Sequence, residues 1–228
     1  MPNSTASSRH ADGSLHHPRF SRWYGHAEPI IERWVGTARR AQNAQAIGRT
    51  LILGAGTGLD IPALGPQVTE VVLLEPDPTM GRVLARRYPD YALVAFPAEA
   101  MPFPAEAFET VISSLVLCSV ADPDRVLAEI ARVLTADGQY LMLEHVASPH
   151  RGIRWIQHGV DPVWRRVGGG CRLTRDVHTA VALSPLRWAS YEPVRGGGLL
   201  PVIRGRALKV PDAQPVRQEE VPSGRAPR

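Results

Sequence analysis

The chain of 228 residues is poor in several features, and each scarcity excludes a class of protein. It has only two cysteines, Cys118 and Cys171, which are too few for a disulfide framework and lack the paired spacing of a zinc site. No apolar run approaches the roughly 18 residues that a membrane span requires. The first twenty residues are rich in Ser, His and Pro and lack the apolar core of a secretory signal. We therefore expect a cytoplasmic protein with no membrane span.

Lysine is almost absent, because Lys209 is the only one and arginine carries nearly all of the positive charge. The net charge is +4, with 26 basic residues against 22 acidic ones and no long run of either sign. Nothing in the chain has the form of a basic patch interleaved with aromatic side chains. We therefore do not expect a nucleic acid as substrate or partner.

The chain does contain a glycine-rich turn directly after a run of apolar strand formers. Leu51-Ile52-Leu53 leads into Gly54-Ala55-Gly56-Thr57-Gly58, which is typical of a buried parallel strand whose exit brings its backbone against a ligand. A helix that begins after the turn would add free N–H groups that suit a carboxylate or a phosphate. We expect such a helix, with Pro62 in its early turns.

A second apolar strand, Val68–Leu74, ends in a carboxylate, Glu75, which Pro76 follows. A carboxylate there accepts hydrogen bonds from both hydroxyls of a ribose, so the two features together predict a nucleoside-containing cofactor. The dinucleotide fingerprint Gly-x-Gly-x-x-Gly requires glycine at its sixth position, where this chain has Leu59. A nicotinamide-dependent oxidoreductase is therefore the weaker alternative.

The rest of the pattern alternates apolar strands with amphipathic helices, which indicates one α/β domain over 18–210. Residues 1–17 and 211–228 are polar and are predicted to be disordered tails. We expect strands near 50–53, 68–74, 91–96, 140–144, 188–194 and 200–210, with the fourth strand and its exit at 108–120. One or two helices are expected at 18–45, and another at 80–87 with Val83 and Leu84 inward. A further helix should begin after the cap at Asp122 and close at 135–138. The last two are expected at 151–167, with Ile153, Ile156, Val160 and Val163 on one side, and at 174–183, with Thr174 as N-cap.

Gly-x-Gly-x-Gly with an acid at the end of the next strand resembles the pattern of the class I S-adenosylmethionine-dependent methyltransferases with a methyltransferase type 11 domain. The segment 97–103, Pro-Ala-Glu-Ala-Met-Pro-Phe, is similar to their adenine-binding loop, with Pro97 at the usual Asp. Arg132-Val133-Leu134 with Asp137-Gly138 is similar to their Arg-Val-Leu-x-x-Gly-Gly. The resemblance runs from 43 to 144. It implies a Rossmann-like, seven-stranded, mostly parallel sheet with an antiparallel final strand and helices on both faces.

A narrower resemblance begins at Leu115. Leu-Val-Leu-Cys-Ser-Val (115–120), Glu-His-Val-Ala (144–147), Asp-Pro-Val-Trp (161–164) and Gly-Cys-Arg-Leu-Thr-Arg-Asp (170–176) occur in that order. Together they resemble the methyltransferase-like subfamily of the animal thiol S-methyltransferases and their bacterial relatives. The animal members carry an N-terminal hydrophobic anchor that this sequence lacks, so we do not carry membrane association over.

The resemblance implies S-adenosyl-L-methionine as the cofactor and assigns residues to it. The glycines shape the cofactor loop, Glu75 binds the ribose, and Ala98 with Glu99 borders the adenine. The predicted cofactor-binding residues are Gly54, Ala55, Gly56, Thr57, Gly58, Glu75, Pro76, Ala98, Glu99 and Leu115.

Methyl transfer is an in-line displacement that needs positioning in a dry pocket more than covalent catalysis, so the absence of a Ser-His-Asp triad is no obstacle. The predicted catalytic residues are His145 and Cys118, which follow strands at the ligand-facing edge. For both, a structural role is the alternative: a hydrogen-bonded histidine, and a small buried thiol.

The predicted substrate pocket takes Tyr24 from N-terminal lid helices at 18–47, and His158 and Asp161 from an inserted helix within 148–173. His158 and Asp161 lie three apart on that helix, and the alternative is that they pair only with each other. A metal site from Glu144, His145, His158 and Asp161 has no diagnostic spacing, so we predict none.

These features predict an enzyme that transfers a methyl group from S-adenosylmethionine to a small molecule. A small thiol is the favoured acceptor. A quinone or phenolic metabolite is the first alternative, and a catalytically silent cofactor-binding protein is the second. The sequence makes no prediction of the oligomeric state.

Overall fold

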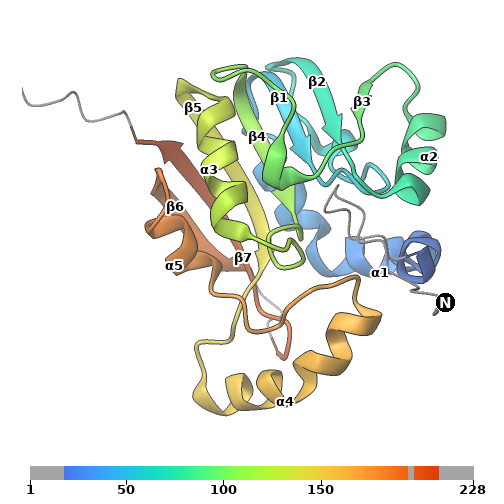
Figure 1. The fold of residues 1–228 in the computed structure, drawn as a ribbon, viewed down its shortest axis with the longest axis vertical. Helices are drawn as coiled ribbons and strands as arrows, with labels where there is room; N and C mark the ends of the chain where they lie inside the picture. Colours follow the sequence, from blue (N-terminus) through green and yellow to red (C-terminus); the bar gives the residue numbers. More distant parts are fainter. Residues whose placement is uncertain (1–17, 195–197, 211–228) are drawn as a thin grey trace, which may run out of the picture.

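The computed structural model describes residues 18–194 and 198–210, so the predicted disordered tails at 1–17 and 211–228 lie outside the described residues. These residues form one seven-stranded sheet with the order β3-β2-β1-β4-β5-β7-β6 (Figure 1). Strand β7 pairs antiparallel with both of its neighbours, and all the other pairs are parallel. The predicted fold class is confirmed. The strands are β1 (Gly48–Leu53), β2 (Val68–Leu74), β3 (Ala92–Val94), β4 (Phe108–Ser114), β5 (Leu134–His145), β6 (Leu186–Val194) and β7 (Val202–Lys209).

Helices cover both faces of this sheet. Because successive strand residues point to opposite faces, Leu51 and Leu53 pack with one set of helices and Ile52 with the other. The first set is α3 (Pro123–Val133) and α5 (Val177–Ala182), which contribute Leu127 and Val181 to the largest core cluster. The second face carries α2 (Pro78–Arg87), through Leu84, and α1 (Pro18–Asn43), through Val35.

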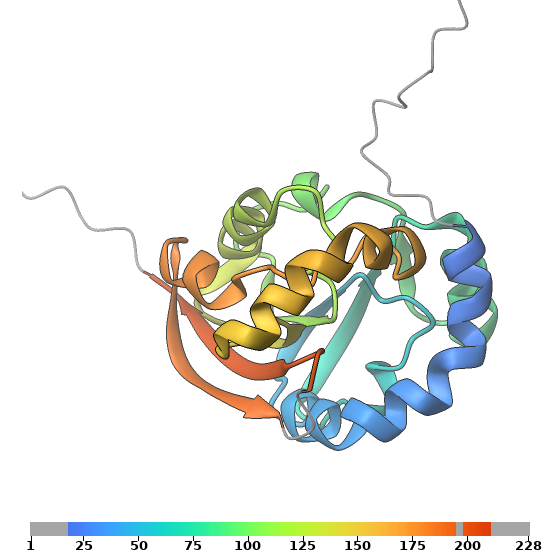
Figure 2. The same cartoon turned by 90° about the horizontal axis from the view of Figure 1, so that it is seen from below.

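The remaining helix, α4 (Arg151–Val167), lies away from both faces. It follows β5 and crosses below the carboxyl ends of the parallel strands, as Figures 1 and 2 show from two directions. Helix α1 runs along one side of the same edge (Figure 2). The bounds of α4 agree with the predicted ones, and the predicted N-terminal helices form one continuous helix that contains Pro29.

The predicted α-helix after the glycine turn is wrong. Only a short 3-10 turn, η1 (Ile61–Ala63), follows, with Pro62 inside it. Asp60 precedes this turn, but its side chain does not cap it. The carboxylate instead accepts hydrogen bonds from Asn43 and Ser114, so it is committed to tertiary contacts that the local sequence does not reveal.

Two predicted helix boundaries are also wrong. Helix α3 ends at Val133 and β5 begins at Leu134, so Gly138 lies within the strand and does not take the left-handed conformation. Helix α5 begins later than predicted, because Asp176 rather than Thr174 is its N-cap and accepts from Thr179 N at 3.0 Å.

The inward faces of two helices differ from prediction. On α2, Leu84 is fully buried but Val83 is 39% exposed. On α4, Ile153 and Val160 are half-buried, whereas Ile156 is 46% and Val163 is 61% exposed. The fully buried residue of α4 is Gln157, which accepts from Ser148 N and donates to Leu199 O. Ile153 and Val160 are seven residues apart and therefore share one face of the helix. This half-buried face is the one turned toward the sheet edge.

Across the described ranges of the chain, no helix is both long enough and apolar enough to cross a bilayer.

Candidate active site

The glycine loop leaves β1 at the carboxyl edge of the sheet, and its three glycines have different reasons to be glycine. All three have positive φ, at 58°, 58° and 91° for Gly54, Gly56 and Gly58. A Cβ on Gly54 would lie 2.7 Å from Val116 Cγ2, and one on Gly58 would lie 2.3 Å from the Tyr88 ring. A Cβ on Gly56 would meet nothing nearer than 3.8 Å. Packing thus requires two of the glycines, while a Cβ on Gly56 would make only ordinary van der Waals contacts.

Glu75 lies next to this loop with both carboxylate oxygens already oriented. Its Oε2 accepts from Gly56 N at 2.7 Å, and its Oε1 accepts from Asp77 N at 2.8 Å. Burial raises the pKa of Glu75 to about 7, against the opposing effect of the two backbone hydrogen bonds. Each oxygen keeps a free lone pair, so the carboxylate retains the capacity to accept two hydroxyl donors.

Thr57 adds an unsatisfied polar group to the loop. Its hydroxyl is buried and has no hydrogen-bond partner in the part of the chain that the structure describes. Buried hydroxyls in native proteins are seldom left unpaired, so this one indicates a missing ligand or water. The uncrowded position at Gly56, the two oriented oxygens of Glu75 and this hydroxyl together fit a polar, hydroxyl-bearing cofactor.

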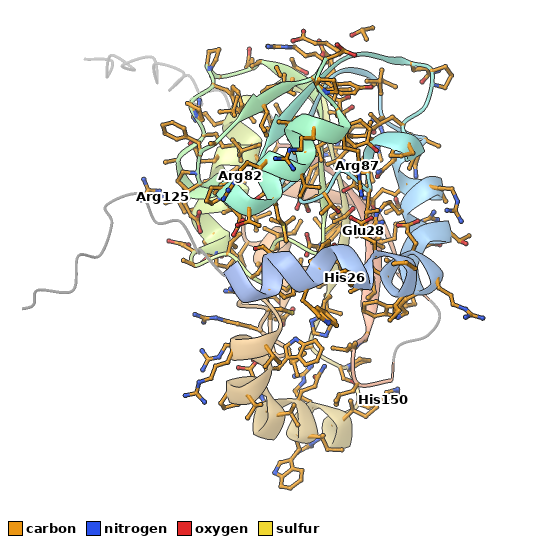
Figure 3. All side chains as sticks on the ribbon, turned by 90° about the vertical axis from the view of Figure 1, so that its right-hand side faces the viewer. His26, Glu28, Arg82, Arg87, Arg125 and His150 are labelled. Atoms are coloured by element: carbon orange, nitrogen blue, oxygen red, sulfur yellow. The ribbon has the colours of Figure 1, made fainter. Side chains whose placement is uncertain are left out.

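Side-chain hydrogen bonds fix helix α1 to the glycine loop and to the residues that follow Glu75. Ser21 Oγ donates to Asp77 Oδ2 at 2.9 Å, beside the Glu75 tip. Arg87 of α2 donates both to Glu28 Oε1 at 3.1 Å and to Thr57 O at 3.0 Å, so one guanidinium joins α1, α2 and the loop (Figure 3). The helix therefore holds the site from its outer side.

Tyr24 of α1 lies in this region. Burial raises the pKa of its phenol to about 12, and the carboxylates of Asp60, Glu28 and Glu75 act in the same direction. Its ring also lies 5.4 Å from that of Phe20. The structure therefore brings Tyr24 to the neighbourhood of Glu75, on the cofactor side of the edge.

Sequence reasoning missed the polar cluster around Asp60. Its Oδ1 accepts from Asn43 Nδ2 at 2.8 Å and from Ser114 Oγ at 2.6 Å, and Arg39 Nε lies 3.3 Å away. Arg39 is itself buried and also pairs with Glu32. The cluster joins α1, the glycine loop and β4. Its one sequence signal was an aspartate two residues after the last glycine of the loop.

The predicted adenine loop forms a short 3-10 turn, η2 (Ala98–Ala100), with Ala98 buried. Glu99 is half-buried, and its Oε1 accepts from Ala121 N at 3.0 Å, which ties this loop to the turn before α3. Leu115, just after β4, has φ of 61°, a left-handed conformation that bulky residues rarely adopt. Such strain concentrates at functional sites.

At the ends of β4 and β5 the structure buries a second carboxylate. Glu144 Oε1 accepts from Ser113 Oγ at 2.7 Å and from Val116 N at 3.1 Å. Its Oε2 is buried and has no partner among the residues described. Burial raises the pKa of Glu144 to about 7. This end of the sheet therefore carries an acid that is poised between its two protonation states.

His145 and Cys118 lie at this same end, together with Cys171, which sequence reasoning had left aside. His145 is buried, its Nδ1 lies 4.0 Å from Cys171 Sγ, and its Nε2 has no partner within the described ranges. Cys118 is 2% exposed, and its Sγ donates to Leu115 O at 3.6 Å. Two effects chiefly raise the pKa of the Cys118 thiol: the larger comes from the Cys171 side chain and the smaller from burial.

The two candidates on α4 do not join this cluster. His158 is exposed. Asp161 accepts from Leu173 N at 2.7 Å and pairs with Arg165 at 3.3 Å, so its partners are these groups rather than His158. Within 18–194 and 198–210, no group of three His, Cys, Asp or Glu side chains is arranged to hold a metal ion.

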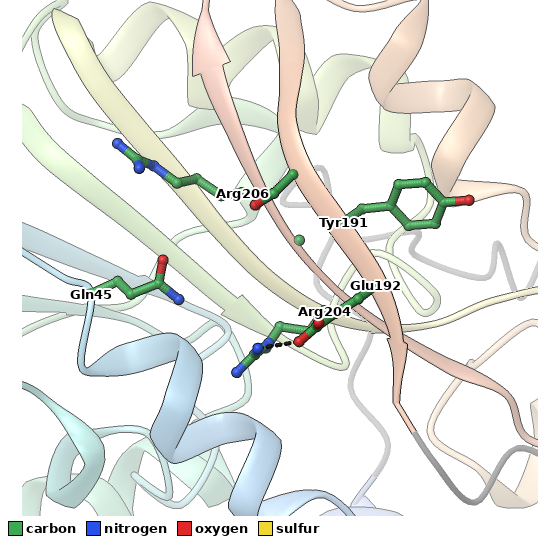
Figure 4. Close-up of a pocket in the computed structure, with 7 residues that line it drawn as sticks. Gln45, Tyr191, Glu192, Arg204 and Arg206 are labelled. Atoms are coloured by element: carbon green, nitrogen blue, oxygen red, sulfur yellow. Dashed lines mark hydrogen bonds and ion pairs between the residues drawn. The ribbon is translucent and has the colours of Figure 1, made fainter.

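A separate cavity of about 200 Å³ lies on the outer strands β6 and β7, next to the end of α1 (Figure 4). Two of the charged side chains that line it pair with each other, because Arg204 pairs with Glu192 across the two strands (Figure 4). None of the glycine-loop, Glu75 or His145 atoms borders it. The chemistry therefore belongs to the carboxyl edge of the sheet.

Comparison with known proteins agrees with this geometry. Residues 51–154 match a family model described as a methyltransferase domain. The chain is 36% identical over 171 residues to thiol S-methyltransferase TMT1B of Homo sapiens, with 70% of each chain covered. It is 33% identical over 112 residues to a demethylmenaquinone methyltransferase of Renibacterium salmoninarum, covering 49% of this chain and 47% of the relative. Among solved structures, geranyl diphosphate C-methyltransferase of Streptomyces coelicolor, crystallised with S-adenosyl-L-homocysteine, superposes with a TM-score of 0.62 at 14% identity over 89% of each chain.

The fold and the loop with its strand-end acid define the protein as an S-adenosylmethionine-dependent methyltransferase. The chain belongs to the class I family of these enzymes, in the subfamily that includes the thiol S-methyltransferases. The predictions of methyltransferase activity and of S-adenosylmethionine as cofactor are therefore confirmed, and the dinucleotide-dependent alternative falls away.

Proposed function

We propose that this methyltransferase acts on a small thiol. The cofactor lies against the glycine loop, and the acceptor lies between the ends of β4 and β5 and the covering helices. The observation that carries the cofactor side is the Glu75 carboxylate, whose two oxygens are each held by one backbone N–H and each keep a lone pair. That arrangement suits the two hydroxyls of a ribose.

The other predicted cofactor residues act around this carboxylate. Gly54 and Gly58 keep the loop folded, Gly56 lets the ligand approach the backbone, and the Thr57 hydroxyl gains the partner that it lacks. Ala55 and Pro76 flank the loop and the acid. Ala98, Glu99 and Leu115 border the adenine end, with Glu99 acting indirectly by fixing the turn at Ala121.

When bound, S-adenosylmethionine supplies an electrophilic methyl group on a sulfonium. The chain contributes position, exclusion of water and a proton acceptor. We assign the last role to His145, because its Nε2 is buried without a partner while its Nδ1 faces Cys171. An acceptor thiol that donates to Nε2 would satisfy this nitrogen and become the more nucleophilic thiolate. Cys118 lines the floor beneath the acceptor as a protonated thiol.

Two segments close the site in this proposal, the lid helix within 18–47 and the insert 148–173. They meet where the ring of Phe20 packs against Gly169, since a Cβ on Gly169 would lie 2.5 Å from that ring. Tyr24 lies on the inner part of α1 and is placed to contact cofactor or acceptor. His158 and Asp161 act on the insert itself, where Asp161 fixes the residues after Cys171 through Leu173 N.

Methylation of a quinone or phenolic metabolite is the second candidate, because a demethylmenaquinone methyltransferase is among the relatives. A phenol loses its proton less readily than a thiol, so it depends more on a base such as His145. The free thiols of both cysteines support a reducing compartment, and we assign the enzyme to the cytoplasm.

Calorimetric titration with S-adenosylmethionine and S-adenosylhomocysteine tests the cofactor side. Glu75→Gln should weaken binding by about 10- to 100-fold, because two charge-assisted hydrogen bonds become neutral ones. The matched control is Glu70→Gln, at the exposed start of the same strand, which should leave affinity unchanged. Equal affinities for the wild type and Glu75→Gln would remove the ribose assignment.

A methyl-release screen over small thiols, phenols and quinols tests the acceptor. Turnover on thiols with little on phenols supports the proposal, and the reverse pattern supports the second candidate. Cofactor binding without turnover on any of these acceptors would favour a silent cofactor-binding protein.

A further inference from the structure

The only two cysteines of the chain, far apart in the sequence, meet in the fold. Cys118 follows β4, and Cys171 follows the three glycines after α4. Each side chain is close enough to shift the pKa of the other. Cys118 is buried and Cys171 is half-buried, so Cys171 is the more exposed residue of the two.

Two hydrogen bonds from residues after Cys171 hold its segment against the exit of β4. Arg172 N donates to Cys118 O at 2.8 Å, and Arg175 Nη2 donates to Val120 O at 2.6 Å. Within its own segment, Cys171 N donates to Gly168 O at 3.1 Å in a turn in which Gly169 and Gly170 have positive φ. The thiol pair is therefore set by several independent contacts rather than by one flexible side chain.

The surroundings favour a thiolate on Cys171 and a thiol on Cys118. The neighbouring Cys118 thiol, and after it His145, whose Nδ1 lies 4.0 Å from the sulfur, hold the pKa of Cys171 well below that of an ordinary cysteine, although burial acts in the opposite direction. The Cys171 side chain and burial raise the pKa of Cys118. The charged groups that face the pair are Glu144, which opposes ionisation of both, and Arg175, which favours it.

We propose that Cys171 and Cys118 form a redox dithiol, in which Cys171 is the thiolate that attacks a hydroperoxide and Cys118 is the thiol that resolves the product to a disulfide. In the first step the Cys171 sulfur attacks the O–O bond, which gives a sulfenic acid and, with one proton, an alcohol or water. In the second step the Cys118 sulfur displaces hydroxide from that sulfenic acid, and its proton leaves with the hydroxide as water. Two thiols are oxidised by two electrons, and the hydroperoxide is reduced by the same two.

The disulfide would fasten the segment after α4 to the exit of β4. It would also remove the thiolate that faces His145 Nδ1. The thiol chemistry stands on its own, whereas an effect on methyl transfer rests on the proposed role of His145. We expect turnover to fall on oxidation and to return after reduction with dithiothreitol.

The first test uses the reduced wild-type chain and needs no variant. Iodoacetamide labelling across pH should modify Cys171 with a midpoint well below the value of about 8.5 for a free cysteine, and should modify Cys118 much more slowly. In denaturant both cysteines should return to the ordinary midpoint. Equal labelling of the two cysteines in the native chain, or an ordinary midpoint for Cys171, would overturn the proposal.

The second test treats the native chain with a few equivalents of hydrogen peroxide, then denatures it and alkylates it for mass spectrometry. The wild type should lose the mass of two hydrogen atoms and take up no alkyl group. After reduction it should regain the two hydrogen atoms. Cys118→Ser should stop at a Cys171 sulfenic acid that dimedone traps, and Cys171→Ser should leave Cys118 a free thiol. Disulfide-linked dimers in place of an internal bond, or oxidation of Cys118 in Cys171→Ser, would refute the assigned order.

Circular dichroism checks that each variant is folded, and Cys→Ala replaces Cys→Ser at a position where serine unfolds the chain. The labelling readouts do not involve cofactor or acceptor. A chain that forms the disulfide but methylates nothing would contradict the proposed function alone, and a chain that methylates thiols but never forms the disulfide would contradict this inference alone.

Discussion

The two halves of the carboxyl edge are built on different principles. The cofactor half, around β1 and β2, is made of backbone: three glycines with positive φ and two N–H groups that hold Glu75. The acceptor half, around β4 and β5, is made of side chains from separate segments: Glu144, His145, Cys118 and Cys171. The first half, which we assign to the cofactor, presents fixed backbone groups, and the second half, which we assign to the acceptor, is a cluster of ionisable groups.

Each half buries one glutamate whose pKa burial raises to about 7, and their partners differ. Both oxygens of Glu75 have a backbone donor, so this carboxylate is oriented. Glu144 has an oxygen without a partner in the described part of the chain, so hydrogen bonds constrain the protonation state of this carboxyl less. The comparison teaches that equal burial raises both pKa values alike, whereas only Glu75 has both of its oxygens oriented by backbone donors.

The largest effect should come from breaking the backbone of the cofactor half. Gly58→Ala should lower the free energy of unfolding by about 3 kcal/mol, because it combines a left-handed alanine with a clash against Tyr88. Gly56→Ala has the strain without the clash and should cost about 1 kcal/mol in urea denaturation, while weakening cofactor binding. Equal stability losses for the two variants would break the distinction between packing glycines and the ligand-facing one.

On the acceptor half, His145→Gln should lower kcat about 100-fold, because a positioned proton acceptor typically contributes at least this much. Cofactor affinity should stay within error, since no contact joins His145 to the glycine loop in the proposal. Steady-state kinetics with a thiol acceptor measures the first quantity and calorimetry the second. His150→Gln, at the exposed start of α4 (Figure 3), is the matched control. A large loss of cofactor affinity in His145→Gln would contradict the division of the edge into a cofactor half and an acceptor half.

Cofactor affinity should depend on pH through Glu75. Ribose hydroxyls donate to the ionised carboxylate, whose pKa in the free protein is about 7, so binding strengthens as pH rises through this value and then levels off. Between pH 8 and pH 6 the dissociation constant should increase about tenfold, and Glu75→Gln should abolish that dependence. A flat profile in the wild type would mean that the carboxylate is ionised throughout or is not used.

The smallest effect concerns stability and Glu144. With its pKa raised to about 7, the folded chain binds more protons than the unfolded chain between the ordinary glutamate value of about 4.3 and 7. The free energy of unfolding therefore falls as pH rises through this window, by about 1 kcal/mol between pH 6 and pH 8 from Glu144 alone. Urea titrations of the wild type and Glu144→Gln should differ in this slope. Identical slopes would contradict a raised pKa of Glu144 in the folded chain.

The cofactor half was largely predictable because its determinants are local. Gly54 to Gly58 and Glu75 stand at the tips of two apolar strands, and parallel strands that follow each other place their carboxyl ends at one edge. The α4 bounds were predicted correctly for the same reason, since periodicity and breaker residues are short-range signals, whereas the seven-stranded sheet was predicted from the family resemblance. The helix after the glycine turn was predicted wrongly, because Asp60 bonds to Asn43 and Ser114 rather than to its own turn.

By itself, the sequence determined the family and the fold class, and it predicted the glycine loop and the strand-end acid that we assign to the cofactor, because glycine conformations and strand-end acids act within a few residues. Tertiary structure decided how the side chains that we assign to the acceptor come together. Only the packed sheet brings Cys171 to Cys118 and His145, raises the pKa of Glu144 by burial, and seats Arg39 on Asp60. Burial and charge–charge contacts depend on which distant segments meet, and that information is carried by the assembled core rather than by any one stretch of the chain.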